Sequence, residues 1–206
     1  MMHKSVSALL IFFLLAFSIE AKETKKYSFR VAYGYASEKD LGDILFTLNF
    51  SRHPRDLSTV AVDGGYLLYE AIGDMPLELY AKGGLSYFYE DQFNNTYEAI
   101  VYLKLIYNLD FYENRVRFGF GEGVSYVNDK LESEVIEARV ENDKTSKFLN
   151  YLDITIDFDI GRVTGVKALE DVYFGYLLKH RSGVFGLYNG VHGGSNYNSL
   201  YIETNF

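Results

Sequence analysis

The stretch Asn196-Tyr-Asn-Ser-Leu-Tyr-Ile-Glu-Thr-Asn-Phe206 closes the sequence and shows the pattern that decides the fold. Leu200, Ile202 and Phe206 share one face of this segment if it is extended, and polar or amphipathic residues alternate with them. A period of two is typical of a β-strand with one apolar face. The segment therefore predicts an amphipathic strand whose last residue is aromatic.

The first residues have the pattern of an export signal. Met1 to Lys4 provides a positive charge, Ala8 to Phe17 is an apolar run, and Ser18 to Ala21 is a plausible cleavage site. The run of roughly ten residues is shorter than the ~20 that a membrane-spanning helix needs. We expect residues 1–21 to be a removed signal peptide and residues 22–206 to form a single domain.

The composition limits both stabilisation and partners. The chain has 19 Tyr and 16 Phe but no Cys, so no disulfide can stabilise it. Its formal net charge of -8 argues against a nucleic-acid partner.

Alternation extends over most of the chain. It is clearest in residues 151–160, where Leu152, Ile154, Ile156, Phe158 and Ile160 alternate with Asp153, Thr155, Asp157 and Asp159. Apolar side chains facing outward and charged ones facing inward are typical of a transmembrane barrel. A soluble sandwich would also alternate, but the export signal, the terminal Phe206 and strands of about ten residues favour the membrane.

We therefore predict an all-β, antiparallel up-and-down barrel in a bacterial outer membrane. The aromatic end of the chain resembles the signal by which the outer-membrane assembly machinery selects its clients, so that machinery is an expected partner. Residues 73–76 and 112–115 are expected to form tight periplasmic turns. Residues 92–97, 129–147 and 184–195 are expected to form longer external loops.

Eight strands are predicted, at about 43–50, 57–72, 77–89, 97–111, 114–127, 148–160, 172–183 and 196–206. Residues 27–35 also alternate and would make a ninth strand, although bacterial barrels have an even number. Ten strands remain the alternative.

Charged residues are predicted to fill the barrel interior. An eight-stranded barrel is just wide enough to be filled by its own side chains, so we expect a paired ionic core without a solute channel. The predicted inward set is Glu78, Lys82, Lys104, Asp110, Arg115, Arg117, Asp153, Asp157, Asp159, Lys179, Arg181 and Glu203.

The candidate chemistry lies on the penultimate strand. The parity of Val172 and Phe174 carries His180 and Ser182 to the lipid-facing side, near the external end where lipid A is expected. Alternate residues of a strand lie about 7 Å apart at Cα, and a neutral imidazole could accept the hydroxyl proton. On the last strand, Asn196 and Asn198 have the same parity and can flank the pair.

Through these residues the chain resembles the lipid A 3-O-deacylases, the PagL-type outer-membrane esterases. The resemblance covers His180-Arg-Ser182 through Phe206 best, and Val62 to Glu70 only loosely. It implies hydrolysis of an ester-linked acyl chain of lipopolysaccharide, with Ser182 as nucleophile, His180 as general base and acid, and Asn198 orienting the imidazole. It implies no cofactor and no metal.

Two positions depart from the family pattern. Gly183 follows the serine where the family has Asn, and Asn198 stands where the family has a carboxylate. An amide can hold the imidazole tautomer, as asparagine does in papain-like sites, but it cannot stabilise an imidazolium by charge. The oxyanion donors would be backbone N–H groups around Gly183 or an amide such as Asn196.

Other readings of the same residues stay open. His180 and Ser182 could belong to a polar rim, and the protein could be a non-enzymatic barrel that binds lipid or a surface partner through residues 129–147. An omptin-like protease is more distant, since it should have ten strands. His53, beside Arg52 and Arg55, is expected in an external loop, where these cations could contact lipopolysaccharide phosphates or stay solvated.

Overall fold

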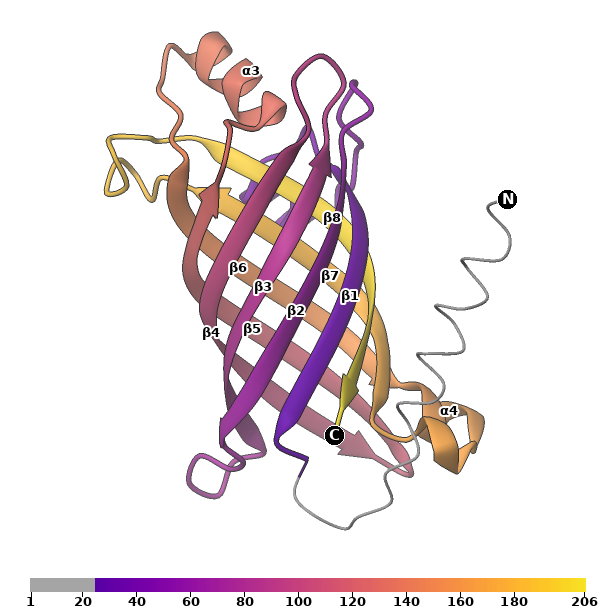
Figure 1. Ribbon diagram of the computed structural model, residues 1–206. Helices are drawn as coiled ribbons and strands as arrows, with labels where there is room; N and C mark the ends of the chain where they lie inside the picture. Colours follow the sequence, from indigo (N-terminus) through magenta and orange to yellow (C-terminus); the bar gives the residue numbers. More distant parts are fainter. Residues whose placement is uncertain (1–24) are drawn as a thin grey trace.

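The computed structural model describes residues 25–206, so the predicted signal peptide lies outside the described residues. Eight antiparallel strands, each paired with its neighbours in the sequence, close into a barrel because β1 also pairs with β8 (Figure 1). The elements are β1 (Tyr27–Ala36), α2 (Leu41–Thr47), β2 (Ser58–Tyr69), β3 (Leu77–Tyr89), β4 (Thr96–Phe111), β5 (Asn114–Val127), α3 (Glu132–Glu141), β6 (Phe148–Asp159), α4 (Ile160–Thr164), the 3₁₀ helix η1 (Lys167–Leu169), β7 (Val172–Ser182) and β8 (Gly194–Asn205).

The predicted strand at 43–50 is wrong, and the ninth candidate is the true first strand. Most of 43–50 belongs to α2, which begins after Asp40 and ends where Leu48 adopts a left-handed conformation. Residues 27–36 instead pair with both β2 and β8. A short apolar run such as Ile44 to Phe50 does not distinguish helix from strand by its periodicity. The barrel thus has eight strands, and the ten-stranded alternative is excluded.

The connections at the two ends of the barrel differ, as predicted. The loops after β1, β3, β5 and β7 lie at the end that carries α3, and the C-terminus lies at the opposite end (Figure 1). Two of the three connections at the C-terminal end are short. The third, between β6 and β7, is longer than the predicted turns because it contains α4 and η1. We refer to the α3 end as the outer end.

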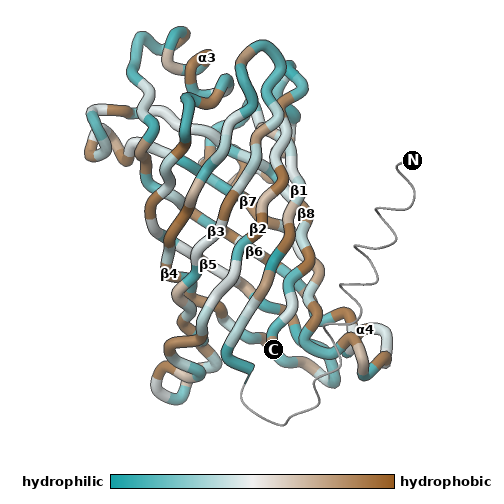
Figure 2. The backbone as a smooth tube through the Cα atoms, in the orientation of Figure 1, coloured by the Kyte–Doolittle hydropathy of each residue, from teal (hydrophilic) through white to brown (hydrophobic). Residues whose placement is uncertain are grey.

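Side chains alternate between the two faces of the barrel wall. Along β4 every second residue from Thr96 to Asn108 is buried while its neighbours are exposed. Hydrophobic and hydrophilic residues are interspersed along the strands (Figure 2). The exposed residues are largely apolar, including Val101, Leu103 and Leu105. No helix within residues 25–206 has both the length and the apolar character to cross a bilayer.

The interior holds the predicted ionic core. Arg30 contacts Asp63 at 2.6 Å and Asp153 at 2.5 Å, and Lys104 adds a contact of 2.7 Å to Asp153. Deeper toward the C-terminal end, Lys82 and Arg117 share Glu203, at 2.7 Å and 3.2 Å. Each of these side chains is almost completely buried. Buried charges are tolerated because each has an opposite charge within hydrogen-bonding distance.

Two members of the predicted inward set lie elsewhere. Asp110 and Arg115 pair with each other beside the β4–β5 turn, where the Asp110 side chain is half exposed. The parity was correct, but the strand leaves the barrel lumen before these residues. Arg30, Asp63 and Glu98 were missed as interior charges although they are buried in it.

An apolar cluster closes the outer end of the interior. Its members are Ala36, Leu57, Phe88, Val127, Leu131 and Tyr197, all nearly inaccessible to solvent. Leu131 directly precedes α3, so the cluster also anchors that helix over the mouth of the barrel.

Candidate functional site

His180 and Ser182 occupy the last outward positions of β7. Tyr176 and His180 point away from the barrel axis, and the intervening Leu177 and Lys179 are buried in the interior. Ser182 lies at the end of β7, paired with Gly194 of β8. His180 and Ser182 are both partly buried. The sequence therefore predicted the strand, the face and the end of the barrel on which these residues lie.

The imidazole of His180 is held by an amide. Its Nδ1 lies 2.8 Å from Oδ1 of Asn196, the residue paired with it across β7 and β8. The amide orientation is set by a second contact, in which Nδ2 of Asn196 donates to the carbonyl oxygen of Lys39 at 3.0 Å. Because Oδ1 can only accept, Nδ1 must carry the proton, and the lone pair is on Nε2. This is the tautomer that a general base needs.

The residue that contacts His180 differs from the one predicted. Asn198 pairs with Leu178 rather than His180, and its Oδ1 accepts a hydrogen bond from the Tyr176 hydroxyl. Asn196, which the sequence suggested only as a possible oxyanion donor, takes the orienting position. The cross-strand register decides between two amides of equal parity, and a single sequence does not reveal that register.

Ser182 is near His180 but is not hydrogen-bonded to it. Within residues 25–206 the Ser182 hydroxyl makes no side-chain hydrogen bond. The two residues are neighbours on one strand face, about 7 Å apart at Cα. Catalytic hydrogen bonds are often long or absent without substrate and tighten when it binds.

The backbone after Ser182 is strained. Val184 and Phe185 both have positive φ angles, of 48° and 53°. This region is costly for a β-branched residue such as Val. Among the described residues, the N–H groups of Val184 and Phe185 donate no hydrogen bond. Two unpaired backbone donors therefore lie two and three residues after the serine.

Gly183, which stands where the family pattern has Asn, is required by the packing around it. A Cβ at this position would lie 1.9 Å from the carbonyl oxygen of Val191. Gly194, paired with Ser182, is equally tight, because its Cβ would lie 1.9 Å from the carbonyl oxygen of Arg181. Side chains larger than hydrogen are thus excluded on both sides of Ser182.

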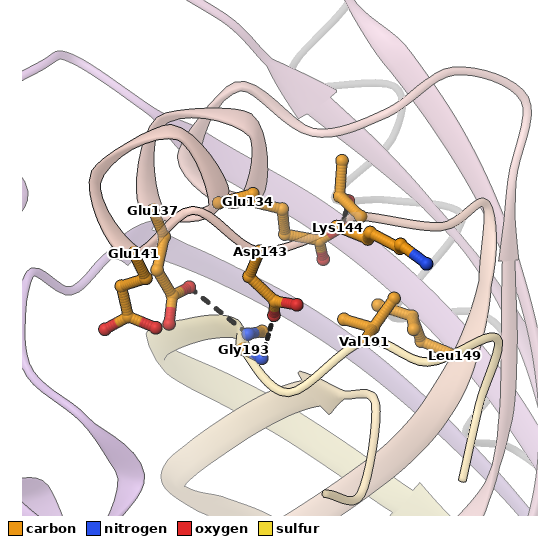
Figure 3. A pocket seen from close by; sticks show the side chains of 11 residues that line it. Glu134, Glu137, Glu141, Asp143, Lys144, Leu149, Val191 and Gly193 are labelled. Atoms are coloured by element: carbon orange, nitrogen blue, oxygen red, sulfur yellow. Dashed lines mark hydrogen bonds between the residues drawn. The ribbon is translucent and has the colours of Figure 1, made fainter. Parts of the chain in front are cut away.

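Acidic residues of the β5–β6 loop bind the backbone beside the site. Asp143 accepts hydrogen bonds from the N–H groups of His192 and Gly193. Glu137 accepts one from Gly194, and the bonds to Gly193 and Gly194 are drawn in Figure 3. The backbone donors hold the pKa of Asp143 well below its usual range, whereas burial raises the pKa of Glu137 to about 7. A cavity of about 10 Å³ lies between α3 and this backbone, enough for about one water molecule and far too small for an acyl chain.

The cations near His53 are paired with carboxylates. Arg52 bonds to Asp56, and Arg55 lies 2.8 Å from Glu132 of α3. His53 accepts a hydrogen bond from the backbone of Arg55 and lies in the loop after β1, as predicted. These contacts reduce the charge that this part of the loop offers to lipid phosphates.

A closed eight-stranded barrel with an apolar outer surface and an ionic interior defines the class, an outer-membrane β-barrel protein. Among solved structures it is similar to the outer membrane enzyme PagL, with a TM-score of 0.58 and 12% identity over 87% of this chain and 99% of that one. It is also similar to Neisserial surface protein A (NspA), with a TM-score of 0.51 and 13% identity over 89% of this chain and 98% of that one.

The comparisons extend to the fold and not to the family. At 12% and 13% identity, the two structures share an architecture with this chain. No protein-family model and no curated protein sequence matches it. The activity must therefore be argued from the site itself, since one fold supports several functions.

Proposed function

We propose that this protein is a serine esterase of the outer leaflet that hydrolyses an ester-linked acyl chain of lipid A. Ser182 is the nucleophile, His180 the general base and acid, and Asn196 the residue that fixes the imidazole tautomer. The observation that carries the proposal is the contact of His180 Nδ1 with an Asn196 amide whose orientation is itself fixed by Lys39.

The reaction would proceed through an acyl-enzyme. Ser182 Oγ attacks the ester carbonyl while Nε2 of His180 takes the hydroxyl proton, and the ester C–O bond breaks as that proton passes to the departing sugar oxygen. Water then attacks the acyl-serine while Nε2 takes a proton from it. The bond between the acyl carbon and Ser182 Oγ breaks as Nε2 returns this proton to Oγ, and the fatty acid is released. The unpaired N–H groups of Val184 and Phe185 are the candidate donors to the oxyanion.

Asn198, which the sequence predicted as the orienting residue, also lies too far from Ser182 to donate to the oxyanion. Gly194 is the residue paired with Ser182, and Asn198 lies four residues further along β8. Four residues of a strand span about 13 Å, which is beyond the reach of an asparagine side chain toward a carbonyl bonded to Ser182.

The resemblance of the fold to an outer membrane enzyme, PagL, agrees with the proposal, and the likeness to a surface protein, NspA, leaves a binding role as its competitor.

The test is mass spectrometry of lipid A from cells that express the wild type, Ser182→Ala or Ser58→Ala. Ser58 is a matched control because it is also a partly exposed serine, at the outer end of β2. Heat-modifiable gel migration confirms equal amounts of folded barrel. We expect one acyl chain to be lost with the wild type and Ser58→Ala and retained with Ser182→Ala. Unchanged lipid A in all three would contradict the proposal and favour a binding barrel.

A further inference from the structure

The loop between β1 and β2, residues 37–57, lies over the outer surface of β7 and β8. Lys39 accepts the hydrogen bond from Asn196, and the ring of Phe50 meets that of Tyr176 edge-on, with centroids 5.5 Å apart. Leu178, between Tyr176 and His180 on the outward face, is completely buried. Equivalent wall positions on β8, such as Leu200, are 58% exposed. This loop, which we call the cover loop, therefore replaces lipid on the face that carries His180.

The cover loop reaches deep along the barrel wall. Tyr176 lies six residues before Ser182, the outer end of β7, and four residues after Val172, its inner end. Six residues correspond to about 20 Å along a strand, or about 15 Å of depth at the usual tilt of barrel strands. The apolar band of such a barrel is about 25 Å tall. Phe50, in contact with Tyr176, thus lies at the level of lipid acyl chains.

Charge is segregated within the cover loop. Residues 38–43 include Glu38, Lys39, Asp40 and Asp43, whereas residues 44–50, Ile-Leu-Phe-Thr-Leu-Asn-Phe, include no charged residue. Ile44 is buried beneath the loop, whereas the apolar side chains that follow it are partly or largely exposed. The exposed ones are Leu45, Phe46, Leu48 and Phe50, and Phe46 is 89% exposed.

This apolar edge continues the lipid-facing wall. Tyr33 of β1 and Leu200 of β8 are more than half exposed and are paired with each other across β1 and β8, the strands that the cover loop adjoins. Exposed apolar surface of this extent is not stable against water in a soluble protein, whereas hydrocarbon solvates it.

We propose that residues 44–50 of the cover loop are inserted in the outer leaflet, where lipid acyl chains contact Phe46, Leu48 and Phe50. The same loop is the entrance through which an acyl chain passes from the bilayer to His180 and Ser182. The second statement rests on the proposed esterase function, and the first does not.

Insertion can be measured by fluorescence, because the chain has no tryptophan. Phe46→Trp and Phe50→Trp give single-tryptophan proteins, to be folded into phosphatidylcholine vesicles with brominated acyl chains. Leu200→Trp on the barrel wall is the control in lipid, and Val140→Trp, at an 80% exposed position of α3, is the control outside the acyl layer. We expect bromine to quench Phe46→Trp and Phe50→Trp as strongly as Leu200→Trp, and Val140→Trp only weakly.

Two results would overturn insertion. One is quenching of Phe46→Trp and Phe50→Trp no stronger than that of Val140→Trp. The other is quenching that decreases as the protein-to-lipid ratio rises, because the apolar edge would then bind a second barrel instead of lipid.

The entrance role has its own measurement, the hydrolysis of lipid A in micelles by purified protein. Replacing both Phe46 and Leu48 by Ser should raise KM about tenfold or more and change kcat little. The reason is that each substitution removes one apolar side chain that contacts hydrocarbon. The control is Val140→Ser. A fall in kcat with unchanged KM would overturn the entrance role. If the wild type hydrolyses nothing, the esterase proposal and the entrance role fail together, and the quenching result still decides insertion.

Discussion

Nδ1 of His180 lies 2.8 Å from Oδ1 of Asn196, and the two residues are directly paired across β7 and β8. The amide is oriented by the carbonyl oxygen of Lys39, which belongs to the loop after β1. Three separate parts of the chain therefore set the protonation of one imidazole. Asn198, two residues away on the same face, bonds to Tyr176 and makes no hydrogen bond to this ring.

This difference predicts unequal effects of two asparagine substitutions. Asn196→Ala should lower kcat for lipid A hydrolysis roughly tenfold, because one orienting hydrogen bond is lost, whereas Asn198→Ala should change kcat little. Asn196→Asp should restore the rate and shift the acidic limb of the pH–rate profile upward, because a carboxylate favours the protonated imidazole. Equal losses from both alanine variants, with unchanged pH profiles, would show that Asn196 has only a structural role.

The interior ion pairs predict which arginine the barrel needs. Arg30 bonds to Asp63, Asp153 and the Tyr102 hydroxyl, and all are buried. Arg30→Met should therefore destabilise the barrel by about 3–5 kcal/mol, because two buried carboxylates each lose one of their cationic partners. Urea titration in detergent, followed by heat-modifiable gel migration, measures the loss.

Arg115→Met is the control for this comparison. Arg115 pairs with Asp110 at the exposed β4–β5 turn, where ion pairs contribute about 1 kcal/mol or less. Similar losses for the two variants would show that the buried network stabilises the barrel no more than a surface pair does.

Docking of the β5–β6 loop should depend on pH. Burial raises the pKa of Glu137 to about 7, with Glu141, Asp40 and Glu134 adding repulsion. In a released loop the group would titrate near 4.5, so the docked state binds the proton more tightly. The contribution of Glu137 to the stability of the docked loop is then fully present below about pH 4.5 and is lost as the pH rises through about 7.

Hydrogen exchange at the Gly194 amide, which donates to Glu137, measures this docking. Its protection factor should fall between pH 5 and 8, and Glu137→Gln should reduce the fall. Some dependence should persist in that variant because burial also raises the pKa of Glu90, in the neighbouring β3–β4 loop, to about 7. A protection factor that is constant over this range would contradict the prediction.

Glu132 joins three outer loops. Its Oε2 accepts hydrogen bonds from the N–H groups of Asp91, Gln92 and Phe93, and its Oε1 bonds to Arg55. Glu132→Gln should weaken this junction by about 1.5–3 kcal/mol, since charge-assisted bonds become neutral ones. Exchange of the amides of residues 91–93 should accelerate accordingly. Glu141→Gln, at the exposed end of the same helix, should leave these amides unchanged.

The fold was largely predictable because a transmembrane barrel records its two faces in the sequence. Apolar and polar residues alternate along β6, so each position can be assigned to the outer wall or to the interior. The tight turn at 112–115 set a strand boundary correctly. Residues 43–50 misled the prediction because five apolar residues in eight positions fit a helix as well as a strand. Asp110 and Arg115 misled it because parity indicates a direction but not how far the lumen extends.

The sequence by itself determined the barrel, its ionic interior and the outward direction of His180 and Ser182, since these follow from a period of two within single strands. The tertiary structure decided that Asn196 rather than Asn198 contacts His180. It also decided that residues 37–57 cover Asn196 and His180. The register between β7 and β8 sets the first, because only residues directly opposed across two strands bring short side chains into contact. Packing between segments far apart in the chain sets the second, and no periodicity within a segment encodes that contact.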